Sequence, residues 1–541
     1  MKIAYVCFNP LGGIRRYIDS LQLALLQSKT EVEIHNFIVY SHSVPPQNIR
    51  DERLFYTFVK SDDSDEEFDV HRDCVNPQIE EAFEKFLDEV QPDLVDFQSL
   101  HEIGASLIGI AKDRGIATTF TVHDYWIICP KFVLLRNDFS LCNGPNKGVN
   151  CVKCFSHTGD VEFNERRKYI ERYQFIRSML LEKTDYLIAV SESVKKRLVH
   201  EGFPPDKIKV VYPVVQVEVG KSKAKIEREK VHIGFIGYTG AYKGVHVLIE
   251  AFKGLDVQKT ELFIYGTIDP FFKETLINLK NGSKNIHIKG AYSPSELESI
   301  FLNIDVLVVS SVWPETGPLV VQEALRSSVP VIGSNIGGIP GYVQGNYGAL
   351  FTPGDISELR GILEKIVDNK EIIRKWKQSI PKLSNLEQFA FEMLCVYDLS
   401  LKKFRFSWHV NHSHTTILRE LDMIPVRKAK IMYNLPAVLQ YLEVQQVDSL
   451  AIFGSGDMGK KVARYFQIKG IEIKAFIDND SKKWGNNYHG IPVIAPDEIN
   501  ISGINHILVV SEWENEILHQ LKEKNLPITS LGIYSFLDKG I

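Results

Sequence analysis

The sequence predicts an α/β protein made of three doubly wound units. Three short β-branched segments each end at a glycine or a turn and lead into a segment with helical periodicity. They are MKIAYVC at Met1, VHIGFIG at Val231 and SLAIFGSG at Ser449. A strand, a turn and a helix in immediate succession form the repeating unit of doubly wound domains. The length of 541 residues is also too great for one ordinary hydrophobic core. We therefore expect three Rossmann-like domains.

The composition is that of a soluble globular protein, with 44% hydrophobic and 24% charged residues. The chain has 63 Lys and Arg against 68 Asp and Glu, a net charge of −5, which gives no support for nucleic acid as the main partner. The first residues are typical of a β-strand rather than a signal peptide, and no apolar run approaches about eighteen residues. We expect a cytoplasmic protein, at most attached to a membrane surface, and the sequence leaves its oligomeric state open.

The first domain is expected over residues 1–215, with a cysteine-rich loop at 129–155. Its predicted strands include Val32–Tyr40, Leu94–Gln98, Thr118–Val122 and Tyr186–Val190, and its predicted helices include Pro77–Val90 and Ile103–Arg114. The run Asp62–Asp69 is dense in carboxylates and is expected to be a solvated loop.

The rest of the chain divides at changes in composition. A charged linker, Gly220–Lys230, opens a second domain expected over residues 216–385. A helix follows over residues 386–406, then a mostly helical connector over 407–447 and a third domain over 448–541. The third domain is about the minimum size for a small α/β fold.

The stretch Ser310–Gly341 is predicted to form a strand end, a loop, a helix, a strand and a glycine-rich loop. Glu315 lies in the loop, and Glu323 lies a little over two helical turns further along. One carboxylate can then face a bound sugar while the other faces its nucleotide. Gly317, Leu319 and Val320 lie near the start of the helix, where free backbone N–H groups attract a diphosphate.

This stretch resembles the Glu-x7-Glu signature of glycosyltransferase family four, whose members are retaining enzymes of the GT-B architecture. The flanking order extends the match through Ala324-Leu325, Pro330-Val331-Ile332 and Gly337-Gly338-Ile339-Pro340. The resemblance covers about Met1–Phe404. It implies two Rossmann-like domains that face each other across a cleft, with the helix at 386–406 crossing back onto the first domain.

The resemblance implies roles for residues outside the signature. Gly12 and Gly13 match the family's Gly-Gly loop, near the donor phosphates or the acceptor, although a plain tight turn would look the same in sequence. His123, after a predicted strand, matches a histidine that contacts the transferred sugar. The alternative is a histidine that is satisfied at a strand end.

Lys243 follows the predicted strand at Val231 and matches a lysine that neutralises the β-phosphate of the leaving nucleotide. The alternative is an ordinary exposed lysine. The family usually has an arginine five residues earlier, where this chain has Tyr238, so one expected donor-binding cation is missing. By the same resemblance, Glu323 binds the nucleotide ribose and Glu315 contacts sugar hydroxyls.

The resemblance implies transfer of a sugar from a nucleoside-diphosphate sugar to a hydroxyl of a glycan or lipid-linked glycan, in surface polysaccharide biosynthesis. It further implies front-face attack in which the donor phosphate helps to deprotonate the acceptor. Glu315, His123 and Lys243 form the expected catalytic group, and no catalytic metal is required. Two alternatives stay open: a sugar-nucleotide epimerase of related two-domain architecture, and a non-catalytic sugar-nucleotide-binding scaffold.

Four of the seven cysteines, Cys129, Cys142, Cys151 and Cys154, have the spacing C-x12-C-x8-C-x2-C. Four thiolates with one CxxC pair suit a closed tetrahedral zinc site that would staple the loop. Reduced thiols are the main alternative, followed by a disulfide or an iron–sulfur cluster.

The segment Asn164–Lys183 interleaves basic residues with aromatic and aliphatic ones. It could lie on an anionic membrane near a lipid-linked acceptor. A helix that faces the core and has one solvated basic face is the stronger alternative.

The third domain carries Gly454, Gly456 and Gly459 as a GxGxxG pattern between a strand and a helix, with Asp478 at the end of the next strand. This order favours a nucleotide-type ligand, and a purely structural module is the alternative. The domain resembles small Rossmann-like modules of sugar-modifying methyltransferases and acyltransferases, through Phe476–Asp480 and Gly490–Ile494. Asp478 and Asp480 also form an Asp-x-Asp, which we expect to be structural.

Overall fold

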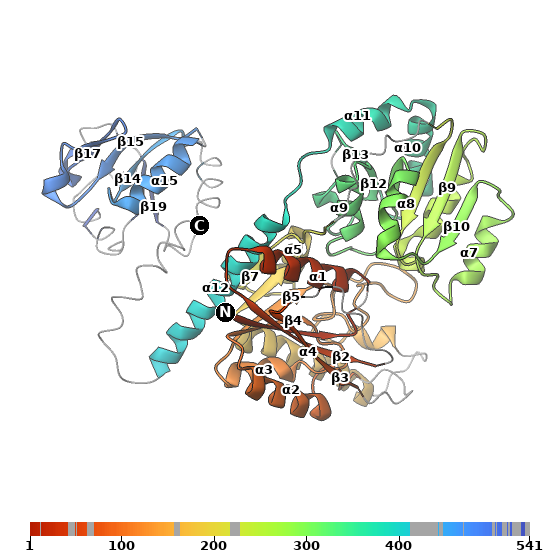
Figure 1. Cartoon of the computed structure of the whole chain (residues 1–541), viewed down its shortest axis with the longest axis horizontal. Coiled ribbons are helices and arrows are strands. Elements are labelled where there is room, and N and C mark those ends of the chain that lie inside the picture. Colours follow the sequence, from red (N-terminus) through yellow and green to blue (C-terminus); the bar gives the residue numbers. More distant parts are fainter. Residues whose placement is uncertain are drawn as a thin grey trace. The chain divides into compact units, whose positions relative to one another are not determined.

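A computed structural model divides the chain into two compact units, Met1–Trp408 and His409–Ile541, and each is described by itself (Figure 1). The structure describes residues 1–10, 12–41, 49, 51–61, 70–155, 163–216, 228–343, 345–411, 442, 447–468, 470–499, 504, 506–510, 517, 520–521 and 532–535. The acidic run Asp62–Asp69, most of the linker Gly220–Lys230 and the connector from residue 412 to residue 441 lie outside these ranges.

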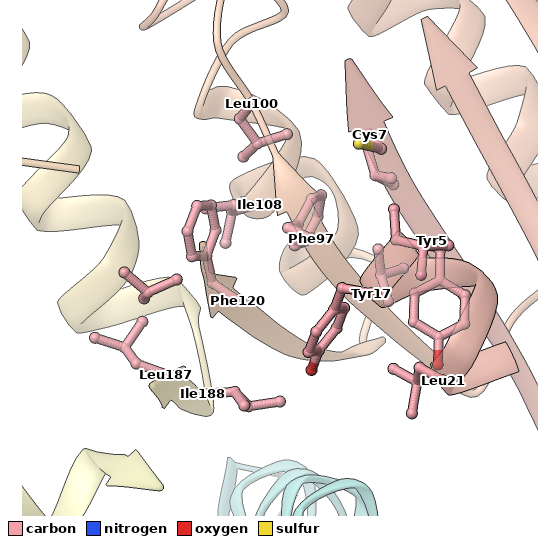
Figure 2. Packing of buried hydrophobic residues seen from close by; sticks show 14 of the residues in the cluster. Tyr5, Cys7, Tyr17, Leu21, Phe97, Leu100, Ile108, Phe120, Leu187 and Ile188 are labelled. Carbon is pink, nitrogen blue, oxygen red and sulfur yellow. The ribbon is translucent and has the colours of Figure 1, made fainter. Parts of the chain in front are cut away.

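The first sheet of the first unit has seven parallel strands in the order β3-β2-β1-β4-β5-β6-β7. The strands are β1 Lys2–Phe8, β2 Glu33–Tyr40, β3 Leu54–Lys60, β4 Leu94–Ser99, β5 Ala117–Val122, β6 Tyr186–Ala189 and β7 Ile208–Val210. The inner strands are nearly continuous hydrophobic runs because helices cover both faces of a parallel sheet. Figure 2 shows Tyr5, Phe97, Phe120 and Leu187 in the core that this sheet builds.

The helices that accompany this sheet are α1 Gly12–Gln27, α2 Pro77–Val90, α3 Ser106–Asp113, α4 Phe163–Ser178 and α5 Glu192–His200, and α4 runs on into a π-helical turn, Met179–Lys183. Helix α2 shows how local sequence sets the boundaries. The Asn76 side chain accepts the N–H of Ile79, Pro77 occupies the first helical position, and Gln91 ends the helix in a left-handed conformation at φ 49°.

The second sheet of the first unit has six parallel strands in the order β10-β9-β8-β11-β12-β13. The strands are β8 Val231–Ile236, β9 Thr260–Tyr265, β10 Ile286–Gly290, β11 Val306–Val309, β12 Val331–Ser334 and β13 Gly348–Phe351. The helices are α6 Val245–Phe252, α7 Lys273–Lys280, α8 Leu297–Asn303, α9 Leu319–Arg326, α10 Ile356–Asp368 and α11 Glu371–Ser379. Val306 and Val308 join the core on one face of the sheet, while Leu307 and Val309 join the core on the other.

Helix α12, Leu386–Asn411, packs against the core of the first sheet. Phe389, Met393 and Tyr397 are fully buried there, and the Tyr397 hydroxyl donates to Asp96 on β4 at 2.7 Å. The helix therefore returns to the first sheet after the second sheet is complete. It continues past the predicted end at residue 406, since no glycine or proline interrupts the sequence there.

The second unit contains a third sheet, in the order β16-β17-β15-β14-β18-β19, in which β16 and β17 are the antiparallel pair. The strands are β14 Ser449–Phe453, β15 Glu472–Ile477, β16 Asn487–Tyr488, β17 Ile491–Ile494, β18 His506–Val509 and β19 Gly532–Ser535, and helix α15 spans Asp457–Ile468. The predicted fold class is confirmed, because the three strand–turn–helix segments recognised in the sequence open the three sheets at β1, β8 and β14.

Strand order reverses beside β1 in the first sheet and beside β8 in the second, since β1 lies between β2 and β4 and β8 between β9 and β11. Doubly wound sheets bind ligands outside the carboxyl ends of their strands at such points. The predicted site residues of the first unit follow β1, β5, β8 and β11. The topology thus places them at the ligand-binding ends of the two sheets.

Candidate active site

The predicted phosphate-binding lysine and the predicted sugar-binding glutamate lie in contact. Lys243 ends a short 3-10 turn after β8, and Glu315 lies in the loop after β11. The Lys243 Nζ lies 2.7 Å from the Glu315 Oε1, and the Ser311 hydroxyl donates to the same oxygen at 2.6 Å. The ammonium also lies 5.0 Å from the ring centroid of Trp313. Only about 7% of the Glu315 side chain is exposed, so this carboxylate is almost fully satisfied by protein groups.

A glycine fixes the distance between the two loops that carry this pair. Gly244 follows Lys243 at φ +68°, and a Cβ at this position would overlap the carbonyl oxygen of Ser310. The Ser310 hydroxyl in turn donates to the Gly244 carbonyl at 2.8 Å. The backbones after β8 and β11 therefore touch, which brings Lys243 to Glu315.

A second close approach supports the Glu315 loop from the side of β12. A Cβ at Gly337 or at Gly338 would overlap the backbone of Glu315 or Thr316, and the Gly338 N–H donates to the Glu315 carbonyl at 2.5 Å. The glycine turn that the sequence places after β12 is thus a packing surface for the loop that carries Glu315.

The same loop contacts residues that follow strands of the first sheet. The Thr316 hydroxyl donates to the backbone carbonyl of His123 at 2.5 Å, and the Ser191 hydroxyl donates to the Thr316 carbonyl at 2.5 Å. A Cβ at Gly317 would lie 3.2 Å from the Val190 side chain. These contacts place Glu315 beside His123, and neither Thr316 nor Ser191 was among the predicted site residues.

His123 follows β5 and is a neutral imidazole. Its Nε2 lies 2.8 Å from the Oε1 of Gln98, which is near the end of the neighbouring strand β4. Burial of the ring lowers the pKa of His123 to about 3, so the ring carries no charge at physiological pH. This group is therefore suited to hydrogen bonding rather than to proton transfer.

The start of α1 faces the start of α9. Gly12 has φ +54° at the first residue of α1, and a Cβ at Gly13 would lie 4.0 Å from the Cδ1 of Leu319. Helix α9 begins at Leu319 after Pro318, so the N–H groups of Leu319 and Val320 have no carbonyl partner within the helix. The predicted diphosphate position, between these glycines and the first turn of α9, is assembled from both halves of the first unit.

The predicted ribose-binding carboxylate, Glu323, is 1% exposed and paired with Arg16 of α1, whose Nη1 lies 2.6 Å from the Glu323 Oε1. Burial raises the pKa of Glu323, and Arg16 opposes this shift. Arg16 was not among the predicted site residues. Its only local signal was a basic residue one helical turn beyond the Gly-Gly pair.

Tyr238 occupies the place where the resembled family has an arginine. Its side chain is 37% exposed, and its ring stacks on that of Tyr242 with the centroids 6.0 Å apart. Burial raises the pKa of the Tyr238 phenol, and nearby Asp269 adds to the shift. The phenol is therefore neutral at physiological pH and supplies no cation for a phosphate.

Two family models together match residues 11–383. The model described as Glycosyltransferase Family 4 matches residues 11–219, and the model described as Glycosyl transferases group 1 matches residues 218–383. The chain belongs to glycosyltransferase family four. A third model, described as C2185-like, N-terminal, matches residues 447–529, in the second unit of this family-four chain.

Curated proteins with similar sequences align with parts of this chain. An uncharacterized 41.2 kDa protein in the cps region of Klebsiella pneumoniae is 31% identical over 204 residues, which are 36% of this chain and 54% of the relative. The sulfoquinovosyl transferase SQD2 of Arabidopsis thaliana is 28% identical over 212 residues, 36% of this chain and 40% of the relative. The chain thus spans about half the length of the curated relatives that it matches.

A solved structure shares the fold of the first unit. The structure of Anabaena Alr3699/HepE in complex with UDP and glucose aligns with a TM-score of 0.54 at 13% identity, covering 74% of this family-four chain and 99% of that chain. At this identity the likeness establishes the two-sheet GT-B fold.

The four clustered cysteines of the family-four chain line one small cavity, together with Pro130, Leu134 and Phe155. All four sulfurs are free of disulfide bonds, so the disulfide alternative is not realised in this structure. Over the ranges that the structure describes, no group of three or more His, Cys, Asp or Glu side chains stands as a ready set of metal ligands. The zinc site therefore stays a prediction.

Helix α4 of the family-four chain turns two of its arginines toward the protein. Arg172 is 2% exposed, donates from Nε to Asp73 at 2.6 Å and donates from Nη2 to the Trp126 carbonyl at 2.7 Å. Arg177 donates to the carbonyls of Glu201 and Gly202. These contacts favour the core-facing interpretation over a membrane-surface helix. In the part of the chain that is described, no helix has the length and apolarity that crossing a membrane requires.

The glycine-rich turn of the second unit is tightly closed. Gly454 has φ +115°, and Gly456 lies between it and Gly459. A Cβ at Gly459 would overlap the Gly454 carbonyl, so helix α15 packs directly on the turn. The Asp478 carboxylate accepts from the Ser455 N–H at 3.0 Å, from its hydroxyl at 2.5 Å and from Lys483 at 3.0 Å. Protein donors thus occupy the carboxylate that would bind a ribose, and the nucleotide site of this unit stays a prediction.

Proposed function

We propose that the chain is a retaining glycosyltransferase that moves a sugar from a nucleoside-diphosphate sugar to a hydroxyl of a glycan acceptor. The observation that carries this proposal is the convergence of Glu315, Lys243 and His123 at the ligand-binding ends of the two sheets of the first unit. A UDP-bound structural neighbour and a relative from a cps region support a uridine-type donor and a role in surface polysaccharide biosynthesis.

Lys243 and Glu315 exchange partners when the donor binds. Before binding, each neutralises the other at 2.7 Å. A donor diphosphate offers Lys243 a second anion, and the sugar hydroxyls offer Glu315 new donors. Each group therefore has a new partner in the donor complex. Lys243 then stabilises the negative charge that grows on the leaving nucleoside diphosphate.

Glu323 and the first turn of α9 hold the nucleotide. The buried Glu323 carboxylate accepts hydrogen bonds from the ribose hydroxyls. The N–H groups of Leu319 and Val320 face the phosphates. Gly317 and Gly13 leave room for this close approach, since neither carries a Cβ.

His123 positions the transferred sugar. With Nε2–H donated to Gln98, its Nδ1 is left as an acceptor for a sugar hydroxyl. The acceptor oxygen attacks C1 of the sugar on the face from which the nucleoside diphosphate departs. Its proton passes to a phosphate oxygen of the leaving group as the bond between C1 and that group breaks. Contact between the Glu315 loop and His123 restricts water beside C1, which favours transfer over hydrolysis.

The acceptor is proposed to be a growing glycan, free or linked to a lipid, which the protein meets in the cytoplasm or at the inner face of the membrane. The epimerase alternative has no support among the relatives described above. A non-catalytic scaffold would bind the donor without turnover, so a transfer assay separates it from an enzyme.

The test begins with a thermal-shift panel of UDP, GDP, ADP, dTDP and their common sugar conjugates, because a ligand that binds the folded state raises Tm by mass action. Nucleoside diphosphate release is then measured with and without candidate glycan acceptors. Release that requires an acceptor supports transfer, whereas acceptor-independent isomerisation of the sugar supports an epimerase. Glu315→Ala and Lys243→Ala should each abolish most of the transfer. Lys253→Ala, which removes an exposed lysine paired with Glu250, is the matched control. Unchanged transfer in both site variants would refute the assignment.

We also propose that the four cysteines bind a structural zinc ion. They line one cavity, and the Gly144 N–H lies 3.4 Å from the Cys142 sulfur, where it can stabilise a thiolate. A tetrahedral zinc site would require all four sulfurs to lie about 2.3 Å from the metal. Metal analysis of protein purified without added zinc should give about one equivalent per chain, lost in Cys151→Ser and kept in the control Cys395→Ser. Less than about half an equivalent in the unaltered protein would refute the site.

A further inference from the structure

We propose that Arg16 is the second diphosphate-binding cation of the donor site and takes the place of the arginine that this chain lacks at position 238. The inference rests on the proposed function and adds a specific binding residue to it. The finding behind it is the 2.6 Å ion pair between Arg16 on α1 and the ribose-facing Glu323 on α9.

The placement of Arg16 follows from how the two helices meet. Gly13 at the start of α1 faces Leu319 at the start of α9, so the two N-termini converge on one point. Arg16 lies about one turn beyond Gly13, and Glu323 about one turn beyond Leu319. Along either helix axis, the ion pair therefore lies about one turn, roughly 5 to 6 Å, from the predicted diphosphate position. A ribose bound at Glu323 would carry its phosphates past the guanidinium toward the first turn of α9.

The Arg16 guanidinium has more N–H donors than its contact with Glu323 uses. Arg16 contacts Glu323 through Nη1, and within the described ranges this is the one ion pair that Arg16 makes. Its side chain is 28% exposed, whereas that of Glu323 is 1% exposed, so a ligand can reach part of the arginine side chain while the carboxylate is buried. A planar guanidinium with five donors can hold a carboxylate and a phosphate oxygen at once, which an ammonium does less well.

The charge balance of the site calls for this cation. A nucleoside-diphosphate sugar brings two negative charges to a site that already contains Glu315 and Glu323. Lys243 supplies one compensating charge and Tyr238 supplies none. Arg15, the next basic residue along, is committed elsewhere: its Nε lies 2.9 Å from Asp19, and its side chain is 8% exposed. Arg16 is the cation that α1 has available for the donor.

A simpler role for Arg16 would be to hold the Glu323 carboxylate in place. The two roles differ in what they recognise. A phosphate-binding arginine strengthens the binding of a nucleoside diphosphate relative to the bare nucleoside. An arginine that acts only through Glu323 strengthens both ligands equally, because both contain the ribose.

The experiment measures Kd for uridine, UMP and UDP by calorimetry on the full chain, with the guanosine, adenosine and thymidine series alongside. The variant is Arg16→Gln, which removes the charge of the guanidinium and keeps a polar amide at this position. We expect the affinity ratio of diphosphate to nucleoside to fall about tenfold, the loss of one charge-assisted hydrogen bond, while nucleoside affinity changes by less than about twofold. Arg53→Gln removes a more exposed arginine of the first unit, paired with Asp51, and is the matched control.

A rescue variant makes the test decisive. Adding Tyr238→Arg to Arg16→Gln returns a cation to the second sheet and should restore most of the lost ratio. Equal weakening of nucleoside and diphosphate, or an unchanged ratio, would overturn the inference. If Arg16→Gln does not fold, the same affinity ratio is measured for Arg16→Lys with and without Tyr238→Arg. Lysine keeps the positive charge but loses the planar, bidentate geometry of the guanidinium. Failure of the unaltered protein to bind any nucleoside diphosphate would instead refute the proposed function itself.

Discussion

The Nε2 of His123 lies 2.8 Å from the Oε1 of Gln98, at one end of a buried chain of hydrogen bonds. Gln98 donates to the Thr121 hydroxyl at 3.3 Å, and Thr121 donates to Asp96 at 3.1 Å. Tyr397 of α12 donates to the other oxygen of Asp96 at 2.7 Å. Since the Gln98 amide nitrogen is committed to Thr121, its oxygen must accept from His123, which places the proton on Nε2 and leaves Nδ1 as an acceptor.

Replacing Gln98 with leucine should lower kcat for transfer about tenfold. Without the hydrogen bond to Gln98, the tautomer of His123 and the orientation of its ring toward the sugar are no longer fixed. The readout is kcat at saturating donor, with Tm measured in parallel. Gln98→Glu should recover part of the activity, since its carboxylate can still accept from Nε2. A leucine variant with unchanged kcat would show that His123 does not need this partner.

Asp96 should make the first unit less stable as pH rises. Burial raises the pKa of Asp96 to about 6, above the value of about 3.9 in an unfolded chain, so the folded state binds the proton more tightly. Its favourable contribution is full at low pH and is lost as pH rises through about 6. Between pH 5 and pH 8 the loss is about 1 to 2 kcal/mol.

The measurement for Asp96 is urea unfolding followed by tryptophan fluorescence at pH 5, 6, 7 and 8, with Asp96→Asn run at each pH. The variant cannot titrate at this position, so the free energy of unfolding of the variant minus that of the unaltered protein should rise with pH. A difference that stays flat would mean that Asp96 is not perturbed by its burial.

Replacing Arg172 with methionine should destabilise the protein by about 3 to 5 kcal/mol, because it leaves the fully buried Asp73 without its guanidinium partner. Burial raises the pKa of Asp73, but the Arg172 charge, together with hydrogen bonds from His101 and from the Glu102 N–H, lowers it to about 2. Arg172→Met combined with Asp73→Asn should lose less than the single variant. Urea unfolding of the three proteins tests this, and a single variant within about 1 kcal/mol of the parent would contradict it.

Gly244→Ala should weaken both folding and donor binding. The added Cβ would overlap the Ser310 carbonyl, and the shift that relieves it must move Lys243 away from Glu315. Gly282→Ala is the matched control, with φ +73° and open space around the added Cβ. We expect about 1 kcal/mol from backbone strain in the control and at least about 2 kcal/mol more in Gly244→Ala. Equal losses, with nucleoside diphosphate affinity unchanged in both, would contradict the contact.

Local sequence determined the elements of this protein and the ends of the strands that carry chemistry. Hydrophobic runs that end at a glycine or a turn placed β1, β8 and β14, and the spacing of Glu315 and Glu323 placed them before and within one helix. These features depend on neighbours a few residues apart, which a single sequence displays directly. The end of α12 was missed because no stop residue marks it.

Only the tertiary structure decided which charge meets which. Arg16 lies on α1, which accompanies the first sheet, and Glu323 lies on α9, which accompanies the second, and nothing in either local sequence predicts their ion pair. The basic face of α4 could not be assigned to solvent or core until Asp73, far away in the chain, was seen to bind Arg172. Such pairs depend on how separately folded elements dock, and docking is set by packing across the whole first unit rather than by periodicity. The sequence therefore indicated the two glutamates and Lys243, whereas only the fold brought Arg16 to Glu323.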